Sequence, residues 1–105
     1  SIFDTRLIDK VAVKGKENPV MVYEVLNGES YDLRDAKKST LPKFKKGFEL
    51  YQNQQFENAL ELFRTCIKKV PEDGVAELYI ERCQKLLSSG WDTETWDGIN
   101  YMDVK

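Results

Sequence analysis

Apolar residues are concentrated in two short stretches near the start of the chain. Residues 7–13 and 20–26 are rich in β-branched and aromatic side chains, and Gly15, Asn18 and Pro19 lie between them. Strand-forming runs on either side of turn-forming residues are typical of a β-hairpin. The pattern therefore predicts that the chain opens with two antiparallel strands.

Both faces of the second predicted strand are apolar. Val20 and Val22 share one face, and Met21, Tyr23 and Val25 share the other. A strand that is apolar on both faces is usually covered on both sides, and a lone two-stranded hairpin is marginal in water. We therefore expect this hairpin to need a sheet that the chain itself does not contain.

The pattern changes after the hairpin. Residues 27–40 are polar and lack a clear period, so they predict a linker that opens with the turn signal Asn27–Gly28. From Leu41 apolar residues recur three or four positions apart, which is the helical period. Pro42 fits the first turn of a helix, where its missing N–H costs nothing. The apolar stripe of this first helix is Leu41, Phe44, Phe48 and Tyr51.

Two further helices complete the predicted module. The second has the strongest helical stripe of the chain and ends before Pro71, and the third runs from after Asp73 to Gly90. The expected fold class is mainly α, with an N-terminal hairpin followed by a three-helix module. The expected divisions are the hairpin at 1–26, the linker at 27–40, and the helical module with its aromatic tail at 41–105.

The composition limits which partners and which catalytic residues the chain can have. The chain has 105 residues, a formal net charge of −2 and no histidine, so nucleic acid is not the default partner and the commonest general base is missing. Cys66 and Cys83 each fall in an apolar helical pattern, which indicates buried packing in a reducing compartment rather than a disulfide or a redox pair. No run approaches the roughly 20 apolar residues of a membrane span.

Residues 41–74 resemble a tetratricopeptide repeat, a helix-turn-helix unit in which a small residue lets the two helices approach closely. The positions that match its signature are Gly47, Tyr51, Phe56, Ala59, Phe63, Cys66 and Pro71. The departures from it are Lys43, Lys46 and Gln54. One repeat cannot bury both of its faces, so the third helix, over 75–88, is expected to cap it.

Residues 5–26 resemble the last hairpin of the catalytic domain of class III adenylate and guanylate cyclases. The residues that carry this resemblance are LIDKVAVKGKENPVMVYEVL. Bacterial cyclases of this family can also carry a degenerate repeat that ends in a W-D-G sequence, which here is Trp96, Asp97 and Gly98. Hairpin, repeat and tail in this order resemble the C-terminal fragment of a bacterial class III cyclase.

The resemblance implies that the chemistry of the parent lies upstream of this chain. The family's metal-binding aspartates, base-reading residues and transition-state asparagine and arginine all precede the hairpin, so none maps onto these residues. We therefore expect no catalytic, cofactor or metal site here. The parent would be a lyase that uses ATP or GTP with a divalent metal, in the cytoplasm or anchored to a membrane through an upstream segment.

The implied function is regulatory contact with protein. The module would dock a separate partner or pair two catalytic protomers in a homodimer, with no nucleic acid and no membrane contact required. Trp91, Trp96 and Tyr101 could form an aromatic docking surface, or the tail could fold over its own helices. The inner groove of the repeat could also receive a peptide.

Two lysine-rich stretches have a plain interpretation beside a functional one. Lys14, Gly15 and Lys16 lack the further glycines and the following helix of a phosphate-binding loop, so they indicate an ordinary hairpin turn. A basic cluster could meet acidic lipid or an acidic partner, although such runs are usually solvated faces. Its members are Lys37, Lys38, Lys43, Lys45 and Lys46.

A free-standing adaptor of the tetratricopeptide type, with no enzyme context, is the alternative interpretation. The hairpin would then pack on the helices as part of an α+β domain. A free domain should have a natural start and enough strands to close its sheet, and the first ten residues and two predicted strands supply neither. An enzyme in its own right is disfavoured, because the sequence shows no nucleophile–base pair, metal cluster or glycine-rich phosphate loop.

Overall fold

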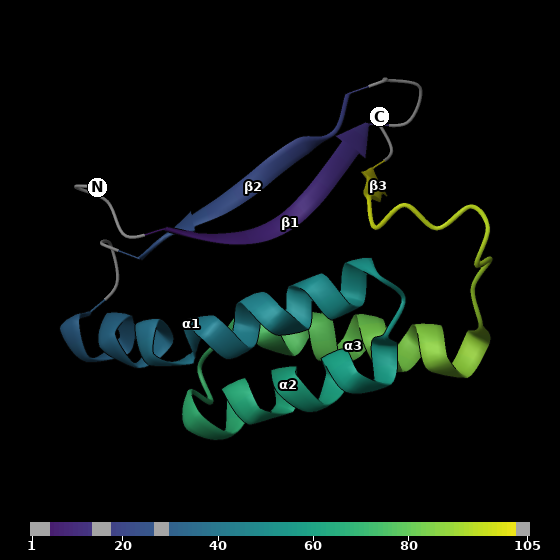
Figure 1. Ribbon diagram of the computed structural model, residues 1–105. Coiled ribbons are helices and arrows are strands. Elements are labelled where there is room, and N and C mark those ends of the chain that lie inside the picture. The colour runs from purple at the N-terminus through teal and green to yellow at the C-terminus, as the bar shows by residue number, and fades with distance from the viewer. Residues whose placement is uncertain (1–4, 14–17, 27–29, 103–105) are drawn as a thin grey trace.

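The computed structural model describes residues 5–13, 18–26 and 30–102. These residues form, in chain order, β1 (Thr5–Val13), β2 (Val20–Val25), α1 (Tyr31–Gln52), α2 (Phe56–Lys69), α3 (Gly74–Ser89) and β3 (Asn100–Met102). The β1–β2 hairpin lies across one side of the three helices, so the molecule has a small sheet layer and a helical layer (Figure 1). The predicted turns at 14–16 and 27–28 lie outside the described residues.

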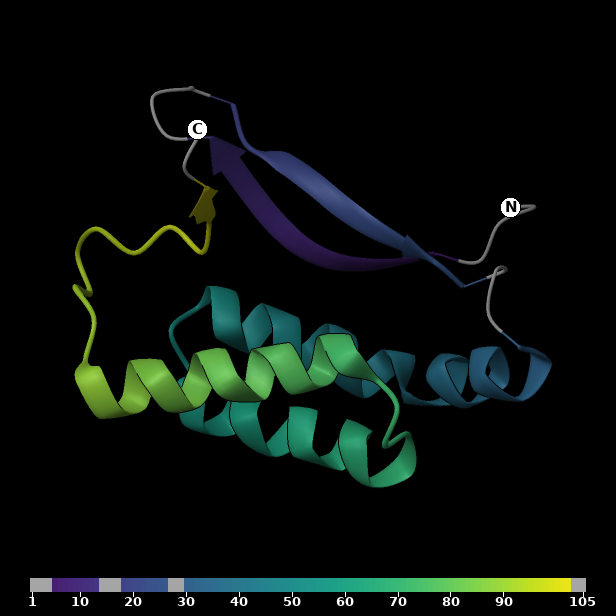
Figure 2. The same ribbon diagram turned by 180° about the vertical axis from the view of Figure 1, so that it is seen from behind.

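The second and third helices lie where the sequence predicts them. α2 ends at Lys69, shortly before Pro71. α3 starts after Asp73, whose carboxylate accepts a hydrogen bond from the Ala76 N–H at 3.2 Å. It stops at Gly90, whose φ of 82° is readily adopted only by glycine. Each helix runs antiparallel to the one before it (Figure 2), and the mainly α prediction is confirmed.

The predicted linker is wrong from residue 31 onward. α1 starts at Tyr31, far ahead of the predicted start at Leu41, and Ser30 caps it by accepting a hydrogen bond from the Leu33 N–H at 3.3 Å. Pro42 consequently lies inside the helix. Its backbone nitrogen carries no hydrogen and cannot donate a hydrogen bond to a carbonyl of the preceding turn.

Buried polar residues explain why the first part of α1 shows no helical period of apolar residues in the sequence. Lys37 and Thr40 are 4% and 2% exposed, and the Lys37 ammonium lies 3.6 Å from the Glu24 carboxylate of the hairpin. The Thr40 hydroxyl donates to the Lys37 carbonyl at 3.0 Å, so it is satisfied within the helix. A helical face that is buried through polar residues leaves no apolar stripe in the sequence.

The sheet has a third strand that the sequence pattern does not reveal. Its order is β2-β1-β3, with β2 antiparallel and β3 parallel to the central β1. β3 comes from the aromatic tail and pairs Asn100 with Val11 and Met102 with Val13. The expectation that the chain contributes only two strands is therefore corrected, because a strand of three residues is too short to show a period.

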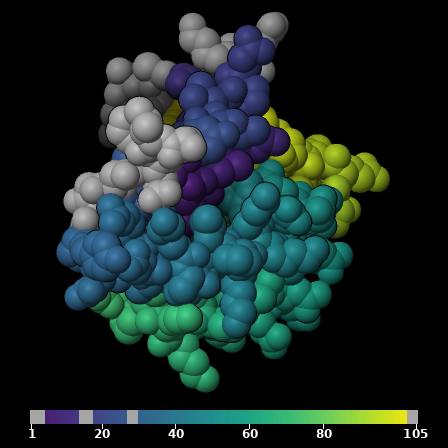
Figure 3. Space-filling view, turned by 60° about the vertical axis from the view of Figure 1, so that its left-hand side comes forward, coloured from purple at the N-terminus to yellow at the C-terminus, as the bar shows by residue number. Residues whose placement is uncertain are grey.

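The core lies among the helices and is strongly aromatic. The rings of Phe63 and Tyr79 stack at 5.0 Å, and Phe44 meets Phe63 edge-on at 5.4 Å. Leu7 and Ile8 of β1 pack against the same core. The hairpin and the helices thus share one apolar interior. Figure 3 shows the surface of the hairpin in contact with that of α1.

Candidate functional site

The inner face of the hairpin is fastened to the helices by a buried ion pair. Arg6 of β1 donates to both carboxylate oxygens of Asp73, at 2.7 and 3.0 Å. Arg6 is 2% exposed and Asp73 is fully buried. The guanidinium also lies 4.2 Å above the Phe44 ring. Two parallel hydrogen bonds and a stacked ring fix both the position and the rotation of β1 over the helices.

The charge of Arg6 is balanced by a second carboxylate on the hairpin itself. Glu24 of β2 accepts a hydrogen bond from Arg6 at 2.8 Å, and its other oxygen lies 3.6 Å from the Lys37 ammonium of α1. Burial raises the pKa of Asp73, but hydrogen bonding and the charge of Arg6 outweigh it, so this pKa is lowered. Strand β2 and helix α1 are thus tied into the same charge network.

A second fork joins the other part of β1 to α3. Arg82 donates to the two carboxylate oxygens of Asp9 at 3.2 and 2.9 Å. The Tyr79 hydroxyl donates to the Ile8 carbonyl at 2.6 Å. This contact coincides with a bulge in β1 between Leu7 and Asp9. The bulge turns the Ile8 carbonyl and the Asp9 carboxylate toward the same helix.

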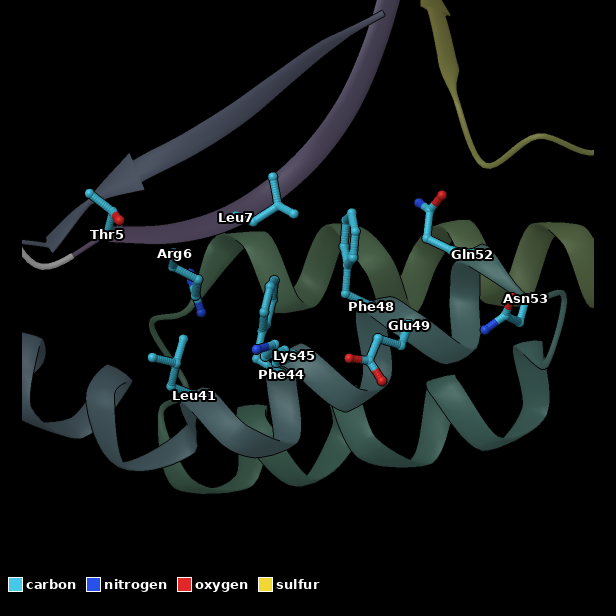
Figure 4. A pocket seen from close by; sticks show the side chains of 10 residues that line it. All are labelled: Thr5, Arg6, Leu7, Leu41, Phe44, Lys45, Phe48, Glu49, Gln52 and Asn53. Atoms are coloured by element: carbon cyan, nitrogen blue, oxygen red, sulfur yellow. The ribbon is translucent and has the colours of Figure 1, made fainter.

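A cavity of about 530 Å³ remains between β1 and α1. Phe44 and Phe48 rise from α1 toward β1, and Leu41 of α1 and Leu7 of β1 complete its apolar lining (Figure 4). The polar residues of its lining are Thr5, Arg6, Lys45, Glu49, Gln52 and Asn53. Its volume falls within the usual range of small-ligand pockets.

The outer face of the hairpin is the exposed counterpart of this docked inner face. Met21, Tyr23 and Val25 are 45%, 56% and 53% exposed, whereas Glu24 between them turns inward to Arg6. We call Met21, Tyr23 and Val25, together with Tyr101 of β3, the outer face. Tyr101 is 49% exposed, and its hydroxyl donates to the Asp97 carboxylate.

The repeat-signature residues come together between α1 and α2. A Cβ on Gly47 would lie 3.1 Å from the Phe63 ring, so glycine permits the close approach of the two helices. Tyr51 meets Phe56 edge-on at 5.5 Å across the inter-helix turn. Ala59 and Cys66 are fully buried in the same core, whereas Pro71 is exposed after α2.

The two predicted docking tryptophans lie against the chain's own helices. Trp91 and Trp96 each meet the Phe56 ring edge-on, at 4.6 and 5.0 Å. The Trp91 indole N–H donates to the Gln54 side chain at 2.8 Å, and the Trp96 indole N–H donates to the Gln52 carbonyl at 2.9 Å. These contacts favour the tail folding back over docking at the tryptophans, and of the three predicted residues Tyr101 is the most exposed.

The lysines and cysteines separate into buried and exposed groups. Lys37 is buried beside Glu24 and therefore leaves the proposed basic cluster, while Lys43, Lys45 and Lys46 are exposed on α1. Cys66 and Cys83 are both free and fully buried. Burial raises the pKa of both thiols, to about 11 for Cys83.

Within the described ranges no three histidine, cysteine or acidic side chains come together as a metal site. Among those same residues no helix is both long and apolar enough to cross a bilayer.

Sequence reasoning missed the residues that dock the hairpin. They are Arg6, Asp9, Glu24, Asp73, Tyr79 and Arg82. Of these residues, only Arg6 could have been suspected from the sequence. An arginine beside an apolar strand pattern needs a charged or polar partner if that strand is buried. The identity of the partner depends on packing between positions 67 residues apart, which no local period encodes.

Comparison with known proteins identifies a protein that is related in sequence to this chain. No family model and no solved structure matches the chain. Over 81 residues, 77% of this chain, the sequence is 42% identical to "Adenylate cyclase, terminal-differentiation specific" of Dictyostelium discoideum. That source gives the expected bacterial origin no support. The matched segment is only 4% of that protein, so the chain spans a small share of its relative's length. Most of this chain is therefore related to one segment of an adenylate cyclase.

Proposed function

We propose that this chain is the C-terminal regulatory part of a class III nucleotidyl cyclase and carries no catalytic residue itself. Its identity to an adenylate cyclase supports the cyclase context. The resemblance of residues 5–26 to the end of a class III catalytic domain supports assigning the hairpin to that domain. The helices then form a module for contact with protein, either a separate partner or a second protomer.

The Arg6–Asp73 pair is the observation that carries this proposal. Arg6 belongs to the proposed catalytic hairpin, and Asp73 belongs to the helical module. A buried ion pair is weak evidence for stability, because apolar residues of the same size often stabilise as well. Its geometry does favour one orientation of the hairpin relative to the helices. A partner that binds the helices can then shift the hairpin, and through it the catalytic domain.

The helical module is best interpreted as a single degenerate tetratricopeptide-like repeat capped by α3. The Gly47–Phe63 approach and the Tyr51–Phe56 contact support this interpretation. The hairpin already covers Phe44, Phe48 and Tyr79, which lie on one side of the helices. A protein partner would therefore bind another face of the module, such as the side of α3 that exposes Leu78.

The cyclase chemistry is assigned to the rest of the parent polypeptide. ATP or GTP with a divalent metal would bind there, in a cytoplasmic domain, because the resemblance of residues 5–26 places the family's metal-binding and base-reading residues upstream of the hairpin. Whether the product is cyclic AMP or cyclic GMP depends on residues of that domain. The adenylate cyclase relative favours cyclic AMP.

The test weakens the docking of the hairpin without leaving a deeply buried charge. Arg82→Gln removes the fork to Asp9, whose side chain is 15% exposed and so can be partly solvated. Arg64→Gln, an exposed arginine on α2, is the matched control. Both changes are made in the longer cyclase polypeptide, and its cyclase activity and sedimentation are measured.

We expect Arg82→Gln to change cyclase activity severalfold, and Arg64→Gln to leave it unchanged. A shift in the monomer–dimer balance with Arg82→Gln would assign the effect to protomer pairing, and an unshifted balance would assign it to a separate partner. If Arg82→Gln lowers the thermal stability of this chain but leaves cyclase activity intact, the proposed coupling is wrong.

The free-standing adaptor remains a second candidate because one observation favours it. Its hairpin should pack on the helices as part of an α+β unit, and β1 does pack on the shared core through Leu7 and Ile8. This candidate requires the chain to bind its partner without a cyclase domain. Pull-down of the same partner by this chain and by the longer polypeptide, with no effect on cyclase activity, would support the adaptor.

A further inference from the structure

The cavity between β1 and α1 is mainly apolar. Leu7 of β1 lies on one side of it, and Leu41, Phe44 and Phe48 of α1 lie on the other (Figure 4). Phe44 and Phe48 are 1% and 8% exposed, so they form its inner wall. Protein interiors are close-packed and leave few voids larger than a water molecule. A cavity of about 530 Å³ with this lining therefore has the size and the polarity of a small-ligand pocket.

The charged groups around the cavity are balanced within the chain. Arg6 and the Lys37 ammonium are matched by two carboxylates in the network described above. Lys45 and Glu49 are exposed residues of the lining, one turn apart on α1, and their charges are opposite. Because these groups leave no net charge to attract an ionised ligand, the cavity suits an uncharged one.

One buried donor beside the cavity is unpartnered within the described chain. The Nη1 and Nη2 groups of Arg6 donate to Asp73 and Glu24. The Arg6 Nε is buried and has no hydrogen-bond partner among the described residues. Arg6 belongs to the lining, and its side chain extends from β1 toward α1, over the Phe44 ring (Figure 4). A buried N–H without an acceptor is unfavourable, so a ligand that supplies an acceptor gains binding energy there.

We propose that the cavity between β1 and α1 binds a small, uncharged and mainly apolar molecule that carries a carbonyl or hydroxyl oxygen. The apolar body packs on Leu7, Leu41 and Phe48, and the oxygen accepts a hydrogen bond from the Arg6 Nε. A neutral oxygen is favoured over a carboxylate because the charge of Arg6 is already matched. The cavity binds such a molecule whether or not the chain regulates a cyclase.

Three probes with one skeleton test the oxygen and the charge separately. Benzophenone has a carbonyl on its central carbon, diphenylmethane has no polar group, and diphenylacetate carries an ionised carboxylate there. Each probe is titrated into this chain, and NMR follows the backbone amide shifts. Arg6 itself is left unchanged, because its loss would also break the pair with Asp73.

We expect benzophenone to bind with a dissociation constant of about 1 mM or lower, and the largest shifts to lie at the cavity. Diphenylmethane and diphenylacetate should bind at least about tenfold more weakly, because neither offers a neutral acceptor to the buried N–H. Equal or tighter binding of either one overturns the proposal. An absence of benzophenone-induced shifts around the cavity also overturns it.

A matched pair of substitutions tests the location. Leu41→Trp adds volume inside the cavity, and Leu78→Trp makes the same change on α3, where Leu78 is 41% exposed and lies outside the lining. Leu41→Phe, which adds less volume, replaces Leu41→Trp if circular dichroism shows that the latter is unfolded. The filled cavity should bind benzophenone at least about tenfold more weakly, and Leu78→Trp should leave binding unchanged. Unchanged binding by a folded variant of Leu41, or weakened binding by Leu78→Trp, would show that the probe binds elsewhere.

Discussion

Arg6 on β1 and Asp73 at the start of α3 form a forked ion pair with N–O distances of 2.7 and 3.0 Å. The same guanidinium lies over Phe44 of α1, and the same carboxylate caps α3. One pair of side chains therefore fixes a strand and two helices relative to one another. This arrangement makes the hairpin a structural part of the helical module, so removing one member of the pair should leave a costly unpaired charge.

Replacing Arg6 should destabilise the fold strongly. Arg6→Met leaves the Asp73 carboxylate buried without its partner, which typically costs about 3–5 kcal/mol of the free energy of unfolding. The measurement is urea denaturation followed by circular dichroism. Arg64→Met, on the exposed side of α2, should change that free energy by no more than about 0.5 kcal/mol. Equal denaturation midpoints for the two variants would show that the pair does not hold the hairpin.

Acid should weaken the structure through Asp73. Burial raises the pKa of this carboxyl, but Arg6 and the Ala76 N–H outweigh burial and lower it below its ordinary value of 3.8. A depressed folded pKa means that the ionised carboxylate contributes stability above pH 3.8, and that this contribution disappears as the pH falls through the folded value. We expect the free energy of unfolding to fall below about pH 4.

The control for this pH dependence is Asp73→Asn, which retains a cap but cannot titrate. Its free energy of unfolding is measured by urea denaturation at several pH values between about 5 and 2, beside that of the native protein. The variant should be less stable near neutral pH and should lose less stability on acidification. Parallel curves for the two proteins would assign the acid sensitivity to other carboxylates.

The parts of the fold that sequence predicted are those held by periodic apolar residues. α2 and α3 follow from stripes that end at Pro71 and Gly90, and the hairpin follows from two β-branched runs around turn residues. The start of α1 was missed because its buried face carries Lys37 and Thr40. β3 was missed because it exists only through its pairing with β1.

In the candidate site, too, some contacts could be predicted from the sequence and others could not. The contact of Gly47 with Phe63 could be predicted from a spacing, because both residues belong to one helix-turn-helix unit. The Arg6–Asp73 and Asp9–Arg82 forks could not, because each joins segments that meet only in the folded chain. The apolar residues on both faces of β2 predicted that both faces are covered. The helices cover one of these faces, and the other is exposed.

The close packing of α1 on α2 should make Gly47 sensitive to a single methyl group. A Cβ there would lie 3.1 Å from the buried Phe63 ring, which also contacts the rings of Phe44 and Tyr79. Overpacking costs about 1–3 kcal/mol, and the better helix propensity of alanine returns about 1 kcal/mol. We expect Gly47→Ala to be neutral to destabilising, and Gly47→Val clearly destabilising.

Gly74, in the first turn of α3, is the matched control for Gly47. A Cβ there meets nothing within 4 Å, and α3 gains helix propensity from the change. Thermal melts should therefore show a Tm that is equal or higher for Gly74→Ala and lower for Gly47→Val. A Gly47→Val protein as stable as the native one would mean that α1 and α2 can separate without loss.

The two cysteines should be inert in the folded chain. Cys66 and Cys83 are fully buried, and burial raises the pKa of both thiols, to about 11 for Cys83. Because the thiolate is the reactive form, both the protonation state and the packing suppress reaction at pH 8. With Ellman's reagent we expect labelling at least about a hundredfold slower than after addition of urea. In Tyr31→Cys the added exposed thiol should react at once while Cys66 and Cys83 do not. A native cysteine that reacts as quickly as this added thiol would show that the aromatic core opens readily around it.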